Sequence, residues 1–381
     1  MTRRVEIAGA GFAGLTAAIA FARRGWSVRL HERAPQPRAF GAGIFIWENG
    51  LRVLEAVDAL DAAMARMHEA PYYWVRGPHG ERVGEYVFGP KVGTRMITMT
   101  RQTLHEALLA SAMRHGVQLC CDSHVTGADP AGRLHTARGE VFDADLVIGA
   151  DGVHSAVRDS LGLLRSRRGT GYGAIRLLLE RTDAERASDE GNAVIYNRAD
   201  GKRRLLQVPC DHDALYLCFT MGAADDEGKR LPLNRDSWSR SFPHLAPLVE
   251  RVAGQGRWDE FEVIKLERWS RGRVAVIGDA AHSMTPALGQ GAGCAMMNAL
   301  SLASFVADAD DVGNALLRWE SAERPLTEHT QDYALRSTQG ESADSAGGTK
   351  WTADAIRTAL HVPTGFEPSR PANITGENAC M

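Results

Sequence analysis

A glycine-rich turn near the start of the chain constrains the fold more than any other segment. It reads Gly-Ala-Gly-Phe-Ala-Gly over residues 9–14 and lies between the apolar run 5–8 and a helical pattern. In this context Gly9 permits a tight turn, Gly11 lets the backbone approach a pyrophosphate, and Gly14 lets the helix pack closely against the strand. The start of the helix adds positive potential for the phosphates. The turn therefore predicts a βαβ unit that binds a dinucleotide.

Two later motifs indicate which dinucleotide is bound. Asp151 follows an apolar strand in the middle of the chain, and Asp279 ends another strand, whose glycine-rich loop 286–293 leads into a helix. The carboxylate of Asp279 suits a hydroxylated chain such as ribityl, and the unpaired N–H groups of the helix start suit the electron-rich pyrimidine edge of a reduced flavin. Glu32, after the second strand, can accept both ribose hydroxyls. The three motifs together predict FAD and disfavour an ordinary glycine-rich turn.

The composition excludes several classes of protein. With 381 residues, the chain exceeds the size at which a single core usually stops growing, so two domains are expected. Its formal net charge of -3 gives no general attraction to nucleic acid or anionic lipid. The cysteines lack metal-ligand spacing, no secretory signal is recognisable, and no apolar stretch approaches the roughly 20 residues that span a bilayer. We therefore expect a cytoplasmic enzyme without a metal, a nucleic-acid partner or a membrane anchor.

The pattern of strands and helices changes along the chain. Strand-like runs alternate with amphipathic helices in the first 160 residues, as a parallel sheet requires, and short β-like runs separated by turns follow. This predicts an α/β fold with a Rossmann-like FAD-binding domain, an inserted, mostly antiparallel β-sheet substrate domain and a C-terminal helical segment. The expected FAD-binding parts are 1–70, 98–171 and 266–345 (the last with interdomain helices), the substrate parts are 71–97 and 172–265, and a C-terminal helix and tail occupy 346–381.

The combined motifs resemble one family, the class A flavoprotein aromatic monooxygenases of the p-hydroxybenzoate hydroxylase fold. The resemblance runs over roughly residues 3–340, and its middle motif, 151–158, resembles a dual contact to FAD and NAD(P)H. One departure is Asn298, where many relatives carry an acid, and it affects a peripheral contact. The residues expected at the cofactor are Gly9, Gly11, Phe12, Ala13, Gly14, Glu32, Arg33, Gly43, Ile44, Arg101, Asp151, Gly278, Asp279, Pro286, Gly289, Gly291, Ala292 and Gly293.

A narrower resemblance indicates the substrate class. The stretches 40–54 and 291–299 resemble the oxygenases of 3-hydroxypyridine carboxylates in vitamin B6 degradation. In such enzymes FAD is reduced by NADH or NADPH and reacts with dioxygen, and the flavin hydroperoxide attacks an electron-rich ring, which then opens. The resemblance therefore implies a small hydroxylated aromatic or pyridine carboxylate as substrate. It implies no catalytic side chain, because the flavin performs the difficult step.

Two side chains in a predicted hairpin are the first candidates for holding the substrate. Arg204 and Tyr216 lie in opposite arms of the hairpin, and each matches a substrate-pocket position of the resembling oxygenases. A guanidinium can bind a carboxylate through two charge-assisted hydrogen bonds. The alternative for Arg204 is a solvated strand charge, and the alternative for Tyr216 is half-buried sheet packing.

Further substrate contacts are expected from three other segments. Tyr73, with Tyr72 as its register alternative, can offer a second phenol to the ring. Arg176 is a charge within an apolar strand, so it either faces the cavity or pairs with an acid. Pro286, in the glycine-rich loop, is expected at both the flavin and the substrate.

Other functions share some of these features. A ring hydroxylase of the salicylate or hydroxynicotinate type has the same flavin motifs and transfers a single oxygen atom to the substrate. A flavin-free binding protein of the same fold is expected to have degraded glycines and acids, whereas all three motifs are intact here. His282 has the residue type of a catalytic base, but its position in the late motif favours a supporting role for the flavin loop.

Overall fold

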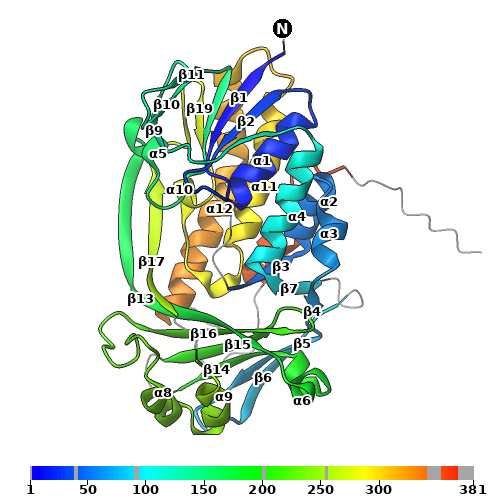
Figure 1. Ribbon diagram of the computed structural model, residues 1–381, viewed down its shortest axis with the longest axis vertical. Helices are drawn as coiled ribbons and strands as arrows, with labels where there is room; N and C mark the ends of the chain where they lie inside the picture. The colour runs from blue at the N-terminus through cyan, green and yellow to red at the C-terminus, as the bar shows by residue number, and fades with distance from the viewer. Residues whose placement is uncertain are drawn as a thin grey trace, which may run out of the picture.

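Two large β-sheets, one above the other in Figure 1, organise the protein. The computed structural model describes residues 2–37, 42–89, 94–199, 203–253, 256–340 and 353–367. The upper sheet belongs to a layered α/β unit, and the lower sheet carries short helices on its outer side (Figure 1). The predicted α/β class, with a C-terminal helix after the main body, is confirmed.

The upper sheet is the expected Rossmann-like sheet. Its strand order is β18-β19-β12-β1-β2-β8, and the pairings from β19 to β8 are parallel. Helix α1 is buried along nearly all of its length, which explains why it is apolar on every side. A Cβ on Gly14 would lie 1.9 Å from the carbonyl oxygen of Gly9, so the close approach of α1 to the turn requires glycine. The strands are β1 (Arg4–Ala8), β2 (Ser27–His31), β8 (Gln118–Cys120), β12 (Leu146–Gly149), β18 (Ser270–Arg271) and β19 (Val274–Val276).

The lower sheet has seven strands in the order β17-β13-β16-β15-β14-β5-β6. All its pairings are antiparallel except that between β14 and β5. Strands β13 and β17 are long and run from the upper part of the molecule to the lower part (Figure 1), so the expected boundary at 171/172 falls within β13. The strands are β5 (Tyr72–Arg76), β6 (Arg82–Val87), β13 (Leu164–Glu180), β14 (Val194–Arg198), β15 (Arg204–Pro209), β16 (Ala214–Gly222) and β17 (Arg257–Leu266).

Two small sheets complete the β-structure, and helices such as α1 pack against the upper sheet. The small sheets contain β3 (Gly43–Trp47), β4 (His68–Glu69) and β7 (Met96–Thr100), and β9 (Val125–Asp129), β10 (Arg133–Thr136) and β11 (Val141–Asp143). The helices are α1 (Phe12–Ala22), α2 (Glu48–Ala56), α3 (Leu60–Met64), α4 (Arg101–Arg114), α5 (Ala156–Ser160), α6 (Asp183–Arg186), α7 (Asp189–Asn192), α8 (Arg235–Ser241), η2 (Pro243–Leu245), α9 (Ala246–Glu250), α10 (Asp279–His282), η3 (Pro286–Leu288), α11 (Gly291–Val306), α12 (Val312–Gln339) and α13 (Ala353–Leu360).

Helix α4 begins at a side-chain cap that the sequence pattern predicts. The hydroxyl of Thr100 accepts a hydrogen bond from the backbone N–H of Thr103 at 3.0 Å. Loss of such a cap typically costs about 1 kcal/mol. We therefore expect Thr100→Ala to lower the free energy of unfolding by about that amount in chemical denaturation, whereas Thr100→Ser keeps the acceptor. Equal losses in both variants would contradict a capping role.

Candidate active site

The strand register decides which side chains of the lower sheet face the upper unit. Arg176 lies opposite Cys218, Cys218 lies opposite Leu206, and Arg204 comes two residues before Leu206. Residues opposite each other share a face of the sheet, as do residues two apart, so Arg176 and Arg204 lie on one face. Cys218 and Leu206 on this face pack in one cluster with Trp47 of β3. We call it the inner face, and it points toward the upper unit.

Tyr216 and Tyr73 also lie on the inner face, in the same cluster. Gly43 approaches Tyr216 so closely that a Cβ on Gly43 would lie 2.6 Å from Cδ1 of the tyrosine ring. Tyr72 turns to the opposite face, where its ring stacks on Trp74 with a centroid distance of 5.9 Å. Of the two register alternatives, Tyr73 is therefore the one that faces the upper unit.

Arg176 and Tyr216 form a polar pair on the inner face. The guanidinium lies close enough to the phenol of Tyr216 to interact with it electrostatically, and it also lies 3.5 Å from Oδ2 of Asp259 and over the ring of Phe261. Burial lowers the pKa of Arg176, but the nearby Tyr216, Cys218 and Asp259 outweigh this effect and raise it. Burial raises the pKa of Tyr216 well above its usual value, so the phenol is neutral. The pair thus presents a fixed positive charge and a neutral phenol.

Two residues of the upper unit, Arg101 and Asp279, lie near the Arg176–Tyr216 pair. Arg101 is the first residue of α4, and its guanidinium lies over the ring of Phe12 at 4.8 Å. Burial lowers the pKa of Arg101, and three charged or polar groups act on it through space, namely Asp279, Arg176 and Tyr216. Residues predicted for the cofactor and residues predicted for the substrate are therefore within electrostatic reach of one another.

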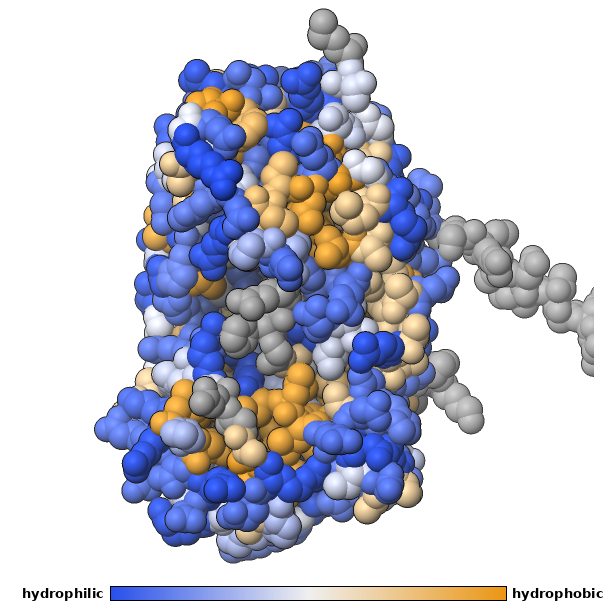
Figure 2. Space-filling model, in the orientation of Figure 1, coloured by the Kyte–Doolittle hydropathy of each residue, from blue (hydrophilic) through white to orange (hydrophobic). Residues whose placement is uncertain are grey.

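Asp279 lies in a recess between these groups. Its side chain is accessible to solvent, yet burial among protein atoms raises its pKa. A side chain can be open to solvent and still be surrounded by protein atoms when it lines a recess in the surface. Gly11 and Pro286 are also exposed, which is consistent with such a recess. Figure 2 shows apolar surface gathered over β15 and β16 on this side of the molecule. A recess with one carboxylate, a glycine-rich turn and the start of α11 fits FAD, and the contact expected between Asp279 and the ribityl chain remains a prediction.

The other residues expected at the cofactor have several environments. Glu32 is half-buried, and its Oε2 accepts a hydrogen bond from the backbone N–H of Ala10 in the glycine-rich turn at 3.1 Å. Arg33 is exposed, whereas Gly43 and Ile44 are buried. The carboxylate of Asp151 accepts hydrogen bonds from Ser155, Ala156 and Val157 at the start of α5, so its contacts within the protein are local.

A buried hydrogen-bond network joins residues 282–285, at the start of the late glycine-rich loop, to helices α11 and α12. Asn298 donates a hydrogen bond from Nδ2 to Nε2 of His282 at 3.0 Å and another to the hydroxyl of Thr327. Burial lowers the pKa of His282 to about 4, so the imidazole is neutral at physiological pH. The hydroxyl of Thr285 donates to the carbonyl of Ala334 on α12. Asn298 thus serves the packing of the loop, and His282 is a buried, neutral member of the same network.

One inner-face tyrosine was not predicted. Tyr196 on β14 stacks on Tyr73 with a centroid distance of 6.4 Å, and the positive charge of Arg204 acts on its phenol. Its position after the β-branched residues Val194 and Ile195 indicates a strand. The pairing of β14 with β5, which brings it beside Tyr73, joins segments more than a hundred residues apart and leaves no local signal.

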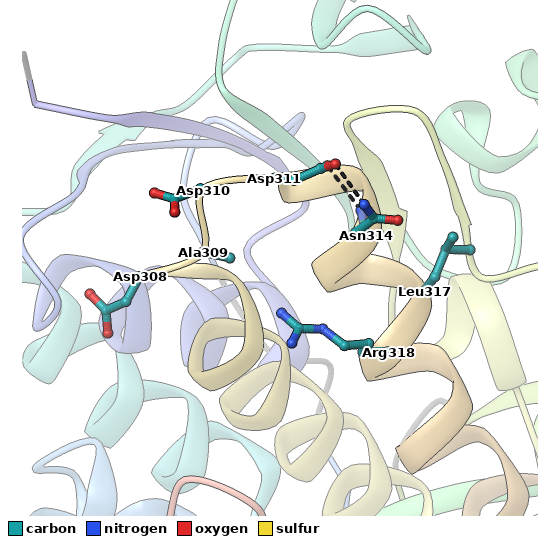
Figure 3. Close-up of a pocket in the computed structure, with 7 residues that line it drawn as sticks. All are labelled: Asp308, Ala309, Asp310, Asp311, Asn314, Leu317 and Arg318. Atoms are coloured by element: carbon teal, nitrogen blue, oxygen red, sulfur yellow. Dashed lines mark hydrogen bonds between the residues drawn. The ribbon is translucent and has the colours of Figure 1, made fainter.

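A surface depression of about 610 Å³ lies away from these motifs, where α11 leads into α12 (Figure 3). Asp311 accepts hydrogen bonds there from the backbone and side chain of Asn314, and so caps α12. Over the described ranges, no group of His, Cys, Asp and Glu residues could hold a metal ion. Within the same part of the chain, every helix is too short or too polar to cross a membrane.

Comparison with known proteins identifies the family of the chain. A family model described as FAD binding domain matches residues 2–326, so the chain belongs to that family, and it is an FAD-dependent aromatic monooxygenase. It is 40% identical to the 2-heptyl-3-hydroxy-4(1H)-quinolone synthase of Mycobacteroides abscessus, over 87% of this chain and 88% of the relative. It is 30% identical to the 6-hydroxynicotinate 3-monooxygenase of Bordetella bronchiseptica, over 78% and 81% of the two chains. A tetrameric form of 2-methyl-3-hydroxypyridine-5-carboxylic acid oxygenase superposes with a TM-score of 0.89 and 42% identity, over 95% of this chain and 97% of that chain.

Proposed function

We propose that the protein is an NAD(P)H-using oxygenase of a 3-hydroxypyridine carboxylate and that oxygenation opens the ring. The observation that carries the proposal is that two cations, Arg176 and Arg204, lie on the inner face, which also carries Tyr216. Arg176 is 3.5 Å from Asp259, but no described carboxylate lies within ion-pair distance of Arg204. A half-buried cation without a carboxylate partner suits an anionic substrate. The similarity to the pyridine-carboxylate oxygenase supports this substrate class.

In this proposal the chain's own residues bind the ring and keep it reactive. The guanidinium of Arg204 donates two hydrogen bonds to the substrate carboxylate. The positive charge of Arg176 and the donor of Tyr216 favour the electron-rich, deprotonated form of the ring hydroxyl. Apolar side chains of the inner face, such as Leu206, help exclude water. When bound beside Asp279, FAD supplies the redox chemistry that couples NAD(P)H to dioxygen.

Labelled dioxygen tests the reaction type. With 2-methyl-3-hydroxypyridine-5-carboxylate, NADH and ¹⁸O₂, we expect faster NADH oxidation and a ring-opened product that contains both labelled oxygen atoms. NADH supplies the two electrons, so the balance requires no other reductant. The measurement is product mass recorded together with NADH consumption. An intact aromatic ring with one labelled oxygen atom would contradict ring opening.

A second candidate is a ring hydroxylase that transfers one oxygen atom and releases the other as water. The similarity to a quinolone synthase and to a hydroxynicotinate monooxygenase favours this candidate. The labelling experiment separates the two reactions, and a substrate panel that includes 6-hydroxynicotinate, salicylate and a 2-alkyl-4-quinolone separates the substrate classes. Preference for the uncharged quinolone over every carboxylate would contradict the role proposed for Arg204.

A further inference from the structure

We infer that Tyr196 positions the guanidinium of Arg204 and thereby sets the preference for acidic substrates. The inference deepens the proposed function and rests on it, because it requires Arg204 to bind the substrate carboxylate. Tyr196 itself need not touch the substrate. It acts as a positioning residue through a contact between two neighbouring strands of the lower sheet.

The strand register brings the two side chains together. Tyr196 lies opposite Leu206, and Arg198 lies opposite Arg204, in the antiparallel pair of β14 and β15. Tyr196 and Arg204 are therefore diagonal neighbours on the inner face, within reach of each other's long side chains. The guanidinium of Arg204 is close enough to the phenol of Tyr196 to act on it electrostatically: burial raises the pKa of Tyr196, and the positive charge of Arg204 opposes this effect.

Aromatic contacts fix both members of this pair. On its other side, the guanidinium carbon of Arg204 lies 5.7 Å from the ring centre of Tyr172 on β13. The ring of Tyr196 stacks on Tyr73 at 6.4 Å with an interplanar angle of 29°, and Tyr73 meets Tyr86 edge-on at 6.1 Å. The arginine is thus oriented before the substrate arrives and loses less conformational entropy on binding.

A phenol can orient a guanidinium without cancelling its charge. Burial raises the pKa of Tyr196, so the side chain is neutral at physiological pH. A carboxylate in its place would neutralise Arg204 and compete with an anionic substrate. The neighbouring Arg203 shows the contrast, because it forms an ion pair with Asp225 at 2.6 Å and bonds to Ser237. Arg203 therefore has a carboxylate partner, whereas Arg204 lies against the tyrosines Tyr172 and Tyr196.

Tyr196→Phe tests the inference, because it removes only the hydroxyl and keeps the ring stack. Binding of 2-methyl-3-hydroxypyridine-5-carboxylate and of 2-methyl-3-hydroxypyridine, which lacks the carboxylate, is measured from the change in flavin absorbance. We expect about fivefold to tenfold weaker binding of the acid and less than about twofold change for the neutral analogue. KM for the acid should rise by a similar factor, while kcat and FAD content stay near wild type.

Two control variants separate positioning from packing. Tyr72→Phe removes a phenol from the opposite face of the same sheet and should change neither probe. In an Arg204→Ala background, Tyr196→Phe should add less than about twofold, because a residue that acts through Arg204 has nothing left to position.

The outcomes distinguish this inference from the proposed function. Equal binding of both probes by the wild-type protein would contradict both the proposed carboxylate substrate and the inference about Tyr196. Wild-type preference for the acid that persists in Tyr196→Phe would overturn the inference alone. Equal weakening of both probes, or additive losses in the double variant, would also overturn it, because Tyr196 would then act on the ring without Arg204.

Discussion

Replacing Asp279 with alanine is expected to yield a folded protein that loses FAD. Asp279 is accessible to solvent, and burial among protein atoms raises its pKa, so its carboxylate is open to a bound cofactor while protein limits its hydration. A hydrogen bond from a ribityl hydroxyl to such a charged group typically contributes about 1.5–3 kcal/mol. The dissociation constant of FAD should therefore rise by roughly tenfold to a hundredfold. Titration of the apoprotein with FAD, followed by flavin fluorescence, measures the change.

Two further variants make this test specific. Asp310→Ala removes an exposed acid from the depression in Figure 3, and it should leave FAD affinity unchanged. Asp279→Asn keeps an acceptor but loses the charge, so its affinity should fall between those of wild type and Asp279→Ala. If Asp279→Ala retains wild-type affinity, the ribityl chain is held by another group.

Much of the upper unit can be predicted from the sequence, because its strands and helices depend on signals from neighbouring residues. The run 27–31 has the alternating apolar pattern of a strand and forms β2, and Thr100 stands before leucines at helical spacing, where α4 begins at Arg101. Both depend on contacts within a few residues, such as the cap at Thr100. The predictions of an FAD cofactor and of the monooxygenase class are confirmed. They could be made because three separate sequence motifs each retain their glycines and acids.

Non-local pairing accounts for what the sequence does not reveal. The parallel pairing of β5 with β14 decides that Tyr73, and not Tyr72, faces the upper unit. A shift of one residue would exchange them, because alternate side chains point to opposite faces. The same pairing brings Tyr196 beside Tyr73, which no local pattern indicates.

The carboxylate of Asp151 illustrates a different limit. Its motif predicts a cofactor contact, and that expectation remains a prediction. Within the protein, the carboxylate binds Ser155 and the first N–H groups of α5, as an acid commonly does at a helix start. A residue type suited to two tasks cannot be assigned to one of them from sequence, because the choice depends on distances that only the fold determines.

Arg204→Ala is expected to abolish most discrimination in favour of acidic substrates. A guanidinium stays charged at any working pH, so Arg204 orients the substrate and transfers no proton. Removing one partner of a desolvated charge pair typically weakens binding by about 2–5 kcal/mol. FAD content and the flavin spectrum should be unchanged, because Arg204 lies on the lower sheet. The measurement compares the dissociation constants of 2-methyl-3-hydroxypyridine-5-carboxylate and its decarboxylated analogue in wild type and variant.

The geometry of the side chain, and not only its charge, should matter. Arg204→Lys keeps the charge but loses the planar fork, so it should recover only part of the affinity. Arg82→Ala is the matched control, because Arg82 belongs to the same sheet but lies on its edge strand and pairs with Glu85 in solvent. Full discrimination in Arg204→Ala would show that the anion is held elsewhere. Arg176 would then be the leading candidate, because its guanidinium shares the inner face and contacts Tyr216.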